Sequence, residues 1–262
     1  MRSCDTVITC LPSPAASAAV VQQMLPEVGP GKVWMEMSTT DEAEVKRLGA
    51  EVIARGGAAV DCPGSGGCHR ADTGNIPIFA GCDRATFDRV LPLLTTMGRR
   101  VLHTGDLGSA SVLKVVTNYL ATANLISCAE ALVTCKGAGM DLPTAYEAIA
   151  ISSGTSFVHE TESQVILNGS RDISFTMDLV KKDIGLFQEV ADRAGVPLEV
   201  NPLMMRIIDD GIARFGPREL SPNIIRRLEE ATGLEIRAPG FPAEMCDEEP
   251  EEPGYEVVPR GR

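Results

Sequence analysis

The first 107 residues alternate between short apolar segments rich in β-branched residues and longer segments with helical periodicity. The segments predicted as strands are 6–12 (TVITCLP), 32–39 (KVWMEMST), 58–63 (AAVDCP), 76–81 (IPIFAG) and 100–105 (RVLHTG). The segments predicted as helices lie between them, at 15–29, 41–57 and 83–98. This alternation is typical of βαβ units, so the α/β part of the chain is predicted to form a parallel sheet with helices on its faces.

The pattern changes after Gly108, where no further strand is predicted. Ser109 to Lys136 predicts one long helix with Gly137 as its C-cap. This helix is apolar on most of its circumference, so we expect it to be largely buried. Further helices are predicted at 142–152, 176–195, 201–216 and 223–233.

These patterns divide the chain into three parts. Residues 1–107 form an α/β domain, and residues 108–233 form an all-helical domain that begins with the long central helix. Residues 234–262 are rich in proline, glycine and glutamate, which predicts an irregular acidic tail whose acid run is a solvated end.

Charge and cysteine usage narrow the classes of partner. The formal net charge of −12 argues against nucleic acid or an anionic membrane surface as the main partner. The amino terminus shows no signal peptide, and no apolar run is long enough for a membrane span. The eight cysteines form no C-x-x-C pair, which argues against structural zinc and favours buried free thiols in a reducing cytoplasm. No metal site is therefore expected.

A glycine-rich segment, DCPGSGGCHRADTGN at residues 61–75, follows a predicted strand directly. Glycines let a backbone approach a ligand closely and expose N–H groups to an anion. A plain turn, with Arg70 as a surface charge, is an equal alternative on this pattern alone. The segment is neither a P-loop nor the G-x-G-x-x-G turn of dinucleotide-binding folds, and the latter is found nowhere in the sequence.

Two pairs of polar residues lie in otherwise apolar helices. Lys114 and Asn118 are four residues apart and so share a helix face, where together they can hold a hydroxyl, a carbonyl or a carboxylate. The alternative is a lysine whose head extends from a core helix to water. Lys182 and Asp183 form the second pair, for which the alternative is a surface ion pair worth about 0–1 kcal/mol.

Taken together, five segments in order resemble the β-hydroxyacid dehydrogenase family, which includes 3-hydroxyisobutyrate dehydrogenase and tartronate semialdehyde reductase. The segments are DTVITCLP, MSTT, DCPGSGGCHRADTG, GDLGSASVLKVVTN and FTMDLVKKD, and they extend from about Cys4 to Gly233. Three positions depart from the family pattern, namely Gly64, Ala110 and Tyr119. These departures concern the shape of the pocket and leave the lysine in place.

The resemblance implies an oxidoreductase that transfers a hydride between NAD or NADP and a small β-hydroxyacid. It implies that Lys114 is the catalytic proton-transfer residue and that Asn118 binds the substrate. The residues implied to receive the substrate carboxylate are Ser65, Gly66 and Gly67. The residues implied to contact the cofactor are Leu11, Pro12, Thr39 and Lys182. The helical domain is expected to form a homo-oligomer.

Compared with the family, the sequence lacks about sixty residues that carry the G-x-G-x-x-G turn and the residue that selects NAD or NADP. The predicted fold is therefore an N-terminally truncated Rossmann-type sheet followed by an all-helical domain, in a chain that is expected to hold its cofactor weakly. The alternative function is a catalytically dead relative that acts as an oligomerisation or binding module.

Overall fold

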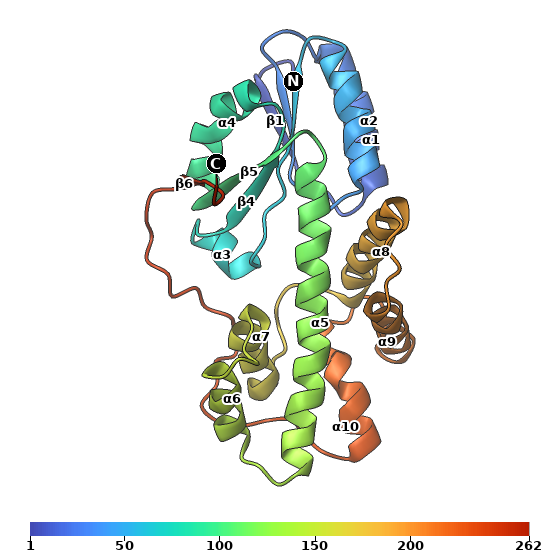
Figure 1. The fold of residues 1–262 in the computed structure, drawn as a ribbon, viewed down its shortest axis with the longest axis vertical. Helices are drawn as coiled ribbons and strands as arrows, with labels where there is room; N and C mark the ends of the chain where they lie inside the picture. The colour runs from blue at the N-terminus through green and yellow to red at the C-terminus, as the bar shows by residue number, and fades with distance from the viewer. Residues whose placement is uncertain (262) are drawn as a thin grey trace. The chain divides into compact units, whose positions relative to one another are not determined.

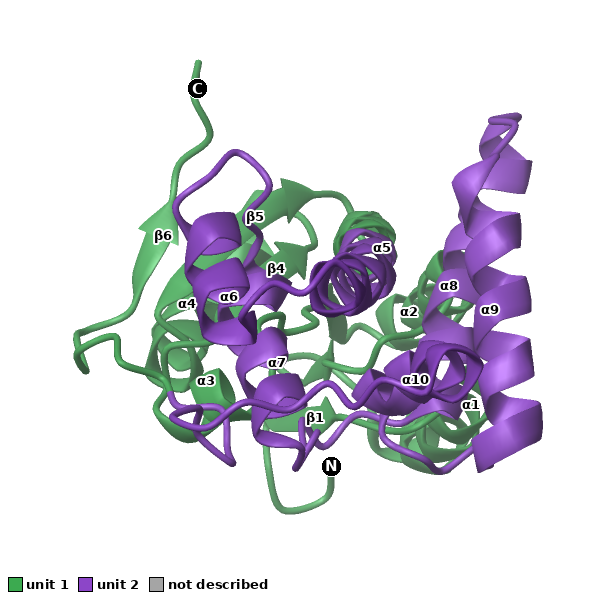
Figure 2. Cartoon of the chain, turned by 90° about the horizontal axis from the view of Figure 1, so that it is seen from below, with its two compact units in different colours: residues 1–117, 247–262 green, residues 118–246 purple. Residues whose placement is uncertain are grey.

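The computed structural model describes residues 1–261, which fold into two compact units. Unit 1 comprises Met1–Thr117 and Asp247–Arg262, and unit 2 comprises Asn118–Cys246 (Figure 2). The predicted boundaries were at residues 107 and 233. The first division in the structure instead lies within a helix, and the last residues of the chain join unit 1.

Unit 1 is built around a six-stranded sheet with the order β1-β2-β3-β4-β5-β6 (Figure 1). Its strands are β1 (Thr6–Thr9), β2 (Val33–Glu36), β3 (Ala58–Asp61), β4 (Pro77–Gly81), β5 (Arg100–Gly105) and β6 (Tyr255–Val257). Its helices are α1 (Pro14–Met24), the 3-10 turn η1 (Leu25–Glu27), α2 (Glu42–Ile53), α3 (Cys68–Asp72) and α4 (Arg84–Met97).

The sheet consists of two parallel halves. Strands β1, β2 and β3 pair in parallel, and so do β4, β5 and β6. The halves meet at an antiparallel pair in which Asp61 of β3 lies opposite Gly81 of β4. Beyond Asp61 the chain turns and runs back along β4, where the N–H of Ser65 donates to the carbonyl of Pro77 at 3.0 Å. The predicted Rossmann-type α/β fold is confirmed, with this one antiparallel junction as an unpredicted feature.

The alternating directions of the β2 side chains explain why helices cover both faces of the sheet in unit 1. Successive strand residues point to opposite faces, and every residue of β2 is buried. Val33 and Met35 belong to a core cluster that includes Phe87 of α4, whereas Trp34 packs with Leu48 of α2. Figure 1 shows α1 and α2 on one side of the sheet and α4 on the other, so the sheet is covered on both faces.

Unit 2 is entirely helical, as predicted. Helix α5 (Ser109–Gly137) begins in unit 1 and continues into unit 2. The other elements are α6 (Leu142–Ala150), α7 (Phe157–Asn168), α8 (Met177–Ala194), α9 (Val200–Phe215), the 3-10 helix η2 (Ser221–Ile225) and α10 (Arg226–Thr232). Figures 1 and 2 show α6 and α7 on one side of α5 and α10 on the other.

Helix α5 is less buried than its sequence predicts. Leu125, Ala129 and Leu132 lie in the core of unit 2, at the spacing of one helix face. Leu120 is 52% exposed and Leu113 is 37% exposed, because only one face of the helix packs into this core. The expectation of a largely buried helix was therefore wrong for a single chain.

Among the described residues, α5 is long and apolar enough to cross a membrane by length and composition, with a mean hydropathy of 1.2. The core helix of a folded domain satisfies the same test. Its contribution to the core of unit 2 accounts for the apolar character of its second half.

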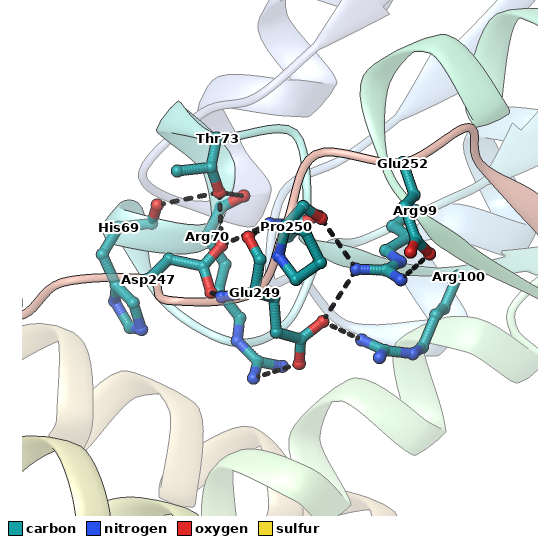
Figure 3. Close-up of polar contacts among 10 residues, drawn as sticks. His69, Arg70, Thr73, Arg99, Arg100, Asp247, Glu249, Pro250 and Glu252 are labelled. Atoms are coloured by element: carbon teal, nitrogen blue, oxygen red, sulfur yellow. Dashed lines mark hydrogen bonds and ion pairs between the residues drawn. The ribbon is translucent and has the colours of Figure 1, made fainter.

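The prediction of an irregular, solvated tail was wrong for the last residues of the chain. Tyr255–Val257 form β6, which pairs in parallel with the edge of β5. Residues just before β6 carry acidic side chains that contact arginines of unit 1, so the acid run is held by protein groups (Figure 3). Composition alone indicated solvation because it could not show that matching basic residues lie beside β5.

Candidate functional site

Polar side chains gather where β1 and β2 end, at the carboxyl edge of the first parallel half of the sheet. Leu11 donates its backbone N–H to Oγ of Ser38 at 2.6 Å, and Ser38 donates its own N–H to Oε1 of Glu36 at 2.8 Å. Glu36 is fully buried, and its Oε2 has no hydrogen-bond partner among the described residues. This edge of a parallel sheet is where α/β folds bind their ligands.

Asp61, the last residue of β3, binds the first turn of α5. Its Oδ2 accepts the backbone N–H of Ser111 at 2.7 Å, and its Oδ1 accepts the Ser111 hydroxyl at 2.8 Å. The first N–H groups of a helix have no partner within the helix, and a carboxylate there also interacts favourably with the helix dipole. Asp61 therefore caps α5 from the sheet and fixes the turn that precedes Lys114.

The surroundings of Asp61 alter its acidity. Burial raises the pKa of Asp61 to about 6, the two hydrogen bonds from Ser111 oppose this rise, and the nearby carboxylate of Glu36 adds to it. Two buried carboxylates at one sheet edge thus repel each other, and protonation of Asp61 relieves the repulsion.

Lys114 lies one turn after Ser111 on α5 and is half-buried, while its neighbour Val115 is buried. Burial raises the pKa of the Cys10 thiol, Glu36 adds to the rise, and the positive charge of Lys114 opposes it. The charge of Lys114 therefore acts on the turn that follows β1, which also contains Leu11 and Pro12. Both groups belong to unit 1, so this relationship lies within one compact unit.

The predicted substrate loop turns sharply at Gly66 and Gly67, whose φ angles are +110° and +89°. Only glycine adopts such angles without strain, which accounts for the pair. The N–H of Ser65 is used by Pro77, so what Ser65 can offer a ligand is its hydroxyl. A Cβ on Gly66 would lie 3.1 Å from Cδ of Arg70, which is a tight contact.

In unit 2, a buried carboxylate joins two of the predicted site residues. Asn118 donates from Nδ2 to Oδ2 of Asp183 at 2.5 Å, and Nζ of Lys182 lies 2.8 Å from Oδ1 of the same carboxylate. The Asp183 side chain is 3% exposed and that of Lys182 is 22% exposed, so the pair is not the surface ion pair given as the alternative. Burying a carboxylate is costly unless it is paired and hydrogen-bonded, and Asp183 meets both conditions.

The predicted residues are divided between the units. Those in unit 1 are Leu11, Pro12, Thr39, Ser65, Gly66, Gly67 and Lys114, and those in unit 2 are Asn118 and Lys182. The roles assigned to these residues stay predictions. Sequence reasoning gave no role to Asp61 or Asp183, although both stand inside the quoted motifs, because burial of a charged residue cannot be seen in the motif itself.

The turn after β1 contains two of the residues that the resemblance assigns to the cofactor. Leu11 and Pro12 offer an apolar surface at the carboxyl end of a parallel strand, and Ser13 caps the amino terminus of α1 by accepting the N–H of Ala16 at 3.2 Å. The assignment of Leu11, Pro12 and Thr39 to the nicotinamide stays a prediction. Within residues 1–261, no group of three or more histidine, cysteine, aspartate or glutamate side chains is arranged to hold a metal ion.

Two family models match the chain. One, described as the NAD binding domain of 6-phosphogluconate dehydrogenase, matches residues 1–105. The other, described as NAD-binding of NADP-dependent 3-hydroxyisobutyrate dehydrogenase, matches residues 108–228. The cofactor is therefore a nicotinamide dinucleotide, NAD or NADP.

Two curated dehydrogenases are similar to this chain in sequence, and a solved structure is similar to it in fold. The chain is 31% identical to 2-(hydroxymethyl)glutarate dehydrogenase of Eubacterium barkeri over 236 residues, which is 88% of this chain and 78% of that protein. It is 29% identical to the NAD-dependent L-serine dehydrogenase of Pseudomonas aeruginosa, covering 88% of this chain and 81% of that one. A structure of 3-hydroxyisobutyrate dehydrogenase from Mycobacterium tuberculosis has the same fold, with a TM-score of 0.78, 23% identity, and coverage of 87% and 80%.

Proposed function

Because the chain belongs to the β-hydroxyacid dehydrogenase family, we propose that it oxidises a small β-hydroxyacid, or reduces the matching aldehyde, with NAD or NADP. The observation that carries this proposal is Lys114, half-buried one helical turn before Asn118, with Asn118 held by the buried carboxylate of Asp183. The reaction is a hydride transfer coupled to a proton transfer.

Lys114 is the proton-transfer residue in this proposal. When bound, the nicotinamide accepts or supplies the hydride. Lys114 takes the proton of the substrate hydroxyl as the carbon–oxygen double bond forms, and returns it in the reverse direction. The cap between Asp61 and Ser111 supports this role because it fixes the preceding turn of α5.

Asn118 orients the substrate hydroxyl. Its Nδ2 is committed to Asp183, which sets the direction of the amide plane. The second N–H of Nδ2 then donates to the hydroxyl oxygen of the substrate, which leaves the hydroxyl proton to Lys114. Asp183 also keeps Lys182 in place. Orientation of this kind contributes to catalysis because reacting groups must be held within narrow limits of distance and angle.

The Ser65–Gly67 loop receives the substrate carboxylate. The donors are the Ser65 hydroxyl and the backbone N–H groups of Gly66 and Gly67, which are accessible because the two glycines carry no side chain. The positive φ angles of Gly66 and Gly67 support this assignment, since they form a sharp turn directly after the antiparallel segment.

The names of the relatives favour one class of substrate. Both 2-(hydroxymethyl)glutarate and L-serine carry a hydroxymethyl group on the carbon that bears a carboxylate. We therefore propose a 3-hydroxypropionate with a substituent at carbon 2, as in 3-hydroxyisobutyrate, with tartronate semialdehyde as the corresponding type of aldehyde.

The test is a direct assay of the purified protein. It is incubated with NAD or NADP and with 3-hydroxyisobutyrate, L-serine or 2-(hydroxymethyl)glutarate, and the reduced nicotinamide is followed by absorbance. Turnover of at least one acid supports the proposal. Tight binding of cofactor and acids with no turnover, at saturating concentrations of both, would identify a catalytically dead binding protein instead.

Cofactor affinity is measured separately by calorimetric titration with NADH and NADPH. The printed sequence contains no G-x-G-x-x-G turn, and pyrophosphate binding in dinucleotide folds depends on the N–H groups of that turn. We expect weak binding, with a dissociation constant well above the micromolar range. Saturating cofactor is therefore needed in the assay.

We also propose a homo-oligomer formed through the helical unit, located in the cytoplasm. Exposed apolar side chains in unit 2 support the first point, among them Leu120 at 52% and Ile151 at 87%. The eight free cysteines support the second. The expectation that they are buried was wrong for four of them, which are exposed, namely Cys4, Cys10, Cys68 and Cys246. Light scattering after size exclusion gives the number of subunits, and fractionation of cells that express the protein gives the location.

A further inference from the structure

The segment between unit 2 and β6 contacts the substrate loop. This segment, residues 247–254, is called the strap. Asp247 accepts hydrogen bonds from Oγ1 of Thr73 at 2.5 Å and from Nδ2 of Asn75 at 2.6 Å (Figure 3). Asn75 is buried, and its Nδ2 also donates to the backbone carbonyl of Glu249 at 2.9 Å. Thr73 and Asn75 lie just beyond α3, so the strap is tied to the far end of the loop that begins at Ser65.

Glu249 lies among three arginines. Its Oε1 is 2.8 Å from the Arg70 guanidinium, and its Oε2 is 2.9 Å from Arg100 and 3.4 Å from Arg99 (Figure 3). These side chains are partly buried, with the Arg99 side chain only 11% exposed. Arg70 belongs to α3, whereas Arg99 and Arg100 lie at the start of β5, so one carboxylate connects α3 to the sheet.

Helix α3 gains little stability from burial. It contains five residues and none of them is buried. A helix this short is not stable by its backbone hydrogen bonds alone, because nucleation is costly and few bonds follow. The beginning of the loop is fixed by the bridge between Gly64 and Ile78. Farther along, Arg70, Thr73 and Asn75 connect the loop to the strap.

The side chain of Arg70 packs against the glycine turn. Cδ of Arg70 lies 3.1 Å from the place that a Cβ of Gly66 would occupy, so the arginine stem lies against the turn. A shift of Arg70 therefore alters the packing against this turn. Glu249 of the strap is thus linked to the turn through Arg70.

We propose that the strap is a brace for the substrate loop, in which Asp247 and Glu249 are positioning residues that hold the Gly66–Gly67 turn ready for the substrate carboxylate. This inference rests on the proposed function of that loop. It goes beyond the dehydrogenase reaction in making the carboxyl-terminal segment a determinant of substrate affinity.

The first measurement separates substrate affinity from turnover. Glu249→Gln removes the charge that holds Arg70, and Glu251→Gln removes an equal charge from an exposed residue of the same strap. We expect Glu249→Gln to raise KM for 3-hydroxyisobutyrate about tenfold, because small displacements of binding groups have large effects. The KM for the cofactor and kcat at saturation should stay within about twofold. Glu251→Gln should match the wild type, and Glu249→Asp, which keeps the charge, should recover part of the affinity.

The second measurement does not depend on activity. Hydrogen–deuterium exchange is followed in the wild type, in Glu249→Gln and in Glu251→Gln, with Asp247→Asn as a further variant. In Glu249→Gln and Asp247→Asn, amides of residues 66–75 should exchange at least about tenfold faster, while those of β1–β3 stay protected. Glu251→Gln should leave both regions unchanged.

The outcomes distinguish the two proposals. Faster exchange at residues 66–75 together with a higher KM supports the brace. Faster exchange in a protein whose wild type oxidises none of the hydroxyacids supports the brace and overturns the proposed function. Unchanged exchange and unchanged KM in Glu249→Gln overturn the brace. A KM that falls in Glu249→Gln also overturns it, because Glu249 would then compete with the substrate carboxylate for Arg70.

Discussion

Asn118 on α5 and Asp183 on α8 share a hydrogen bond of 2.5 Å between Nδ2 and a carboxylate that is almost completely buried. The bond joins the two helices of unit 2 that carry predicted site residues. It also explains why an asparagine stands in an apolar part of α5, since its amide has a fixed acceptor.

Replacing Asp183 should affect both stability and activity. In Asp183→Ala, Asn118 loses its acceptor and Lys182 loses its ion pair, which should lower the free energy of unfolding by about 1–3 kcal/mol. The loss of orientation should lower kcat/KM by about 10- to 100-fold. Urea denaturation and steady-state kinetics measure the two effects. Asp192→Ala, at an exposed position of α8, is the control and should change stability by less than about 0.5 kcal/mol.

Removing the amine of Lys114 should act on turnover. Lys114→Ala is expected to lower kcat by about 10²–10⁴-fold, the usual contribution of a general acid or base, while the far-ultraviolet spectrum stays unchanged. Lys136→Ala, at an exposed position of the same helix, provides the matched loss of charge. Substantial turnover in the Lys114 variant would assign the proton transfer to another group.

The hydroxyl of Ser65 should contribute to carboxylate binding. Ser65→Ala removes one donor, which at about 1–3 kcal/mol corresponds to an increase in KM of about 5- to 150-fold. The same loop predicts that isobutanol, which lacks the carboxylate, is a far poorer substrate than 3-hydroxyisobutyrate. Equal kcat/KM values for the acid and the alcohol would contradict the assignment of this loop.

Asp61 should make folding stability depend on pH. Its pKa is raised from about 4 in the unfolded chain to about 6 in the folded protein, so the folded state binds the proton more tightly. The stabilisation is fully present below pH 4 and is lost as the pH rises through 6, by about 3 kcal/mol at 1.36 kcal/mol per pKa unit.

The comparison with Asp61→Asn isolates this effect from other titrating groups. The amide does not titrate, so the difference in unfolding free energy between wild type and variant should change by about 2–3 kcal/mol, in favour of the variant, between pH 4 and pH 7. Chemical denaturation at several pH values gives this difference. A constant difference over the whole range would show that Asp61 titrates normally.

Gly254 should be the residue on which docking of β6 depends most. A Cβ there would lie 2.3 Å from the carbonyl oxygen of Thr95 and 2.4 Å from that of Gly98, which are backbone atoms that cannot turn aside. Gly254→Ala should lower stability by about 1–3 kcal/mol through overpacking and accelerate amide exchange in β6. Gly29→Ala, where no atom lies within 4 Å of the added Cβ, should be close to neutral in thermal unfolding.

Periodicity predicted most of the fold because it reports burial on one face. The strands β1 to β5 and the helices α1, α2, α4 and α5 were all expected within a few residues of their observed bounds. Helix α7 was missed because its sequence, FVHETESQVILN, mixes polar and β-branched residues and shows no clean apolar stripe. Strand β6 was missed because three residues after a run of glutamate and proline give no strand signal, and its partner is far away in the sequence.

The candidate site was predictable in its motifs and not in its supports. Lys114, Asn118 and Lys182 stand out as polar residues in apolar helices. The two supporting carboxylates were given no role. Asp61 lies next to a glycine loop, and Asp183 was paired with Lys182, for which a surface ion pair was the alternative. Their importance depends on burial, which only the folded chain shows.

The order of segments in unit 1 has a consequence for synthesis on the ribosome. The strand that closes the sheet, β6, is made only after the whole of unit 2 has been translated. Until then the outer edge of β5 presents unpaired backbone groups, which other nascent chains can recruit by strand addition. The newborn protein therefore passes through a period of exposure whose length is set by the translation time of residues 118–246. Chaperone demand should fall in a circular permutant that begins just before β6, because β6 is then translated before β5.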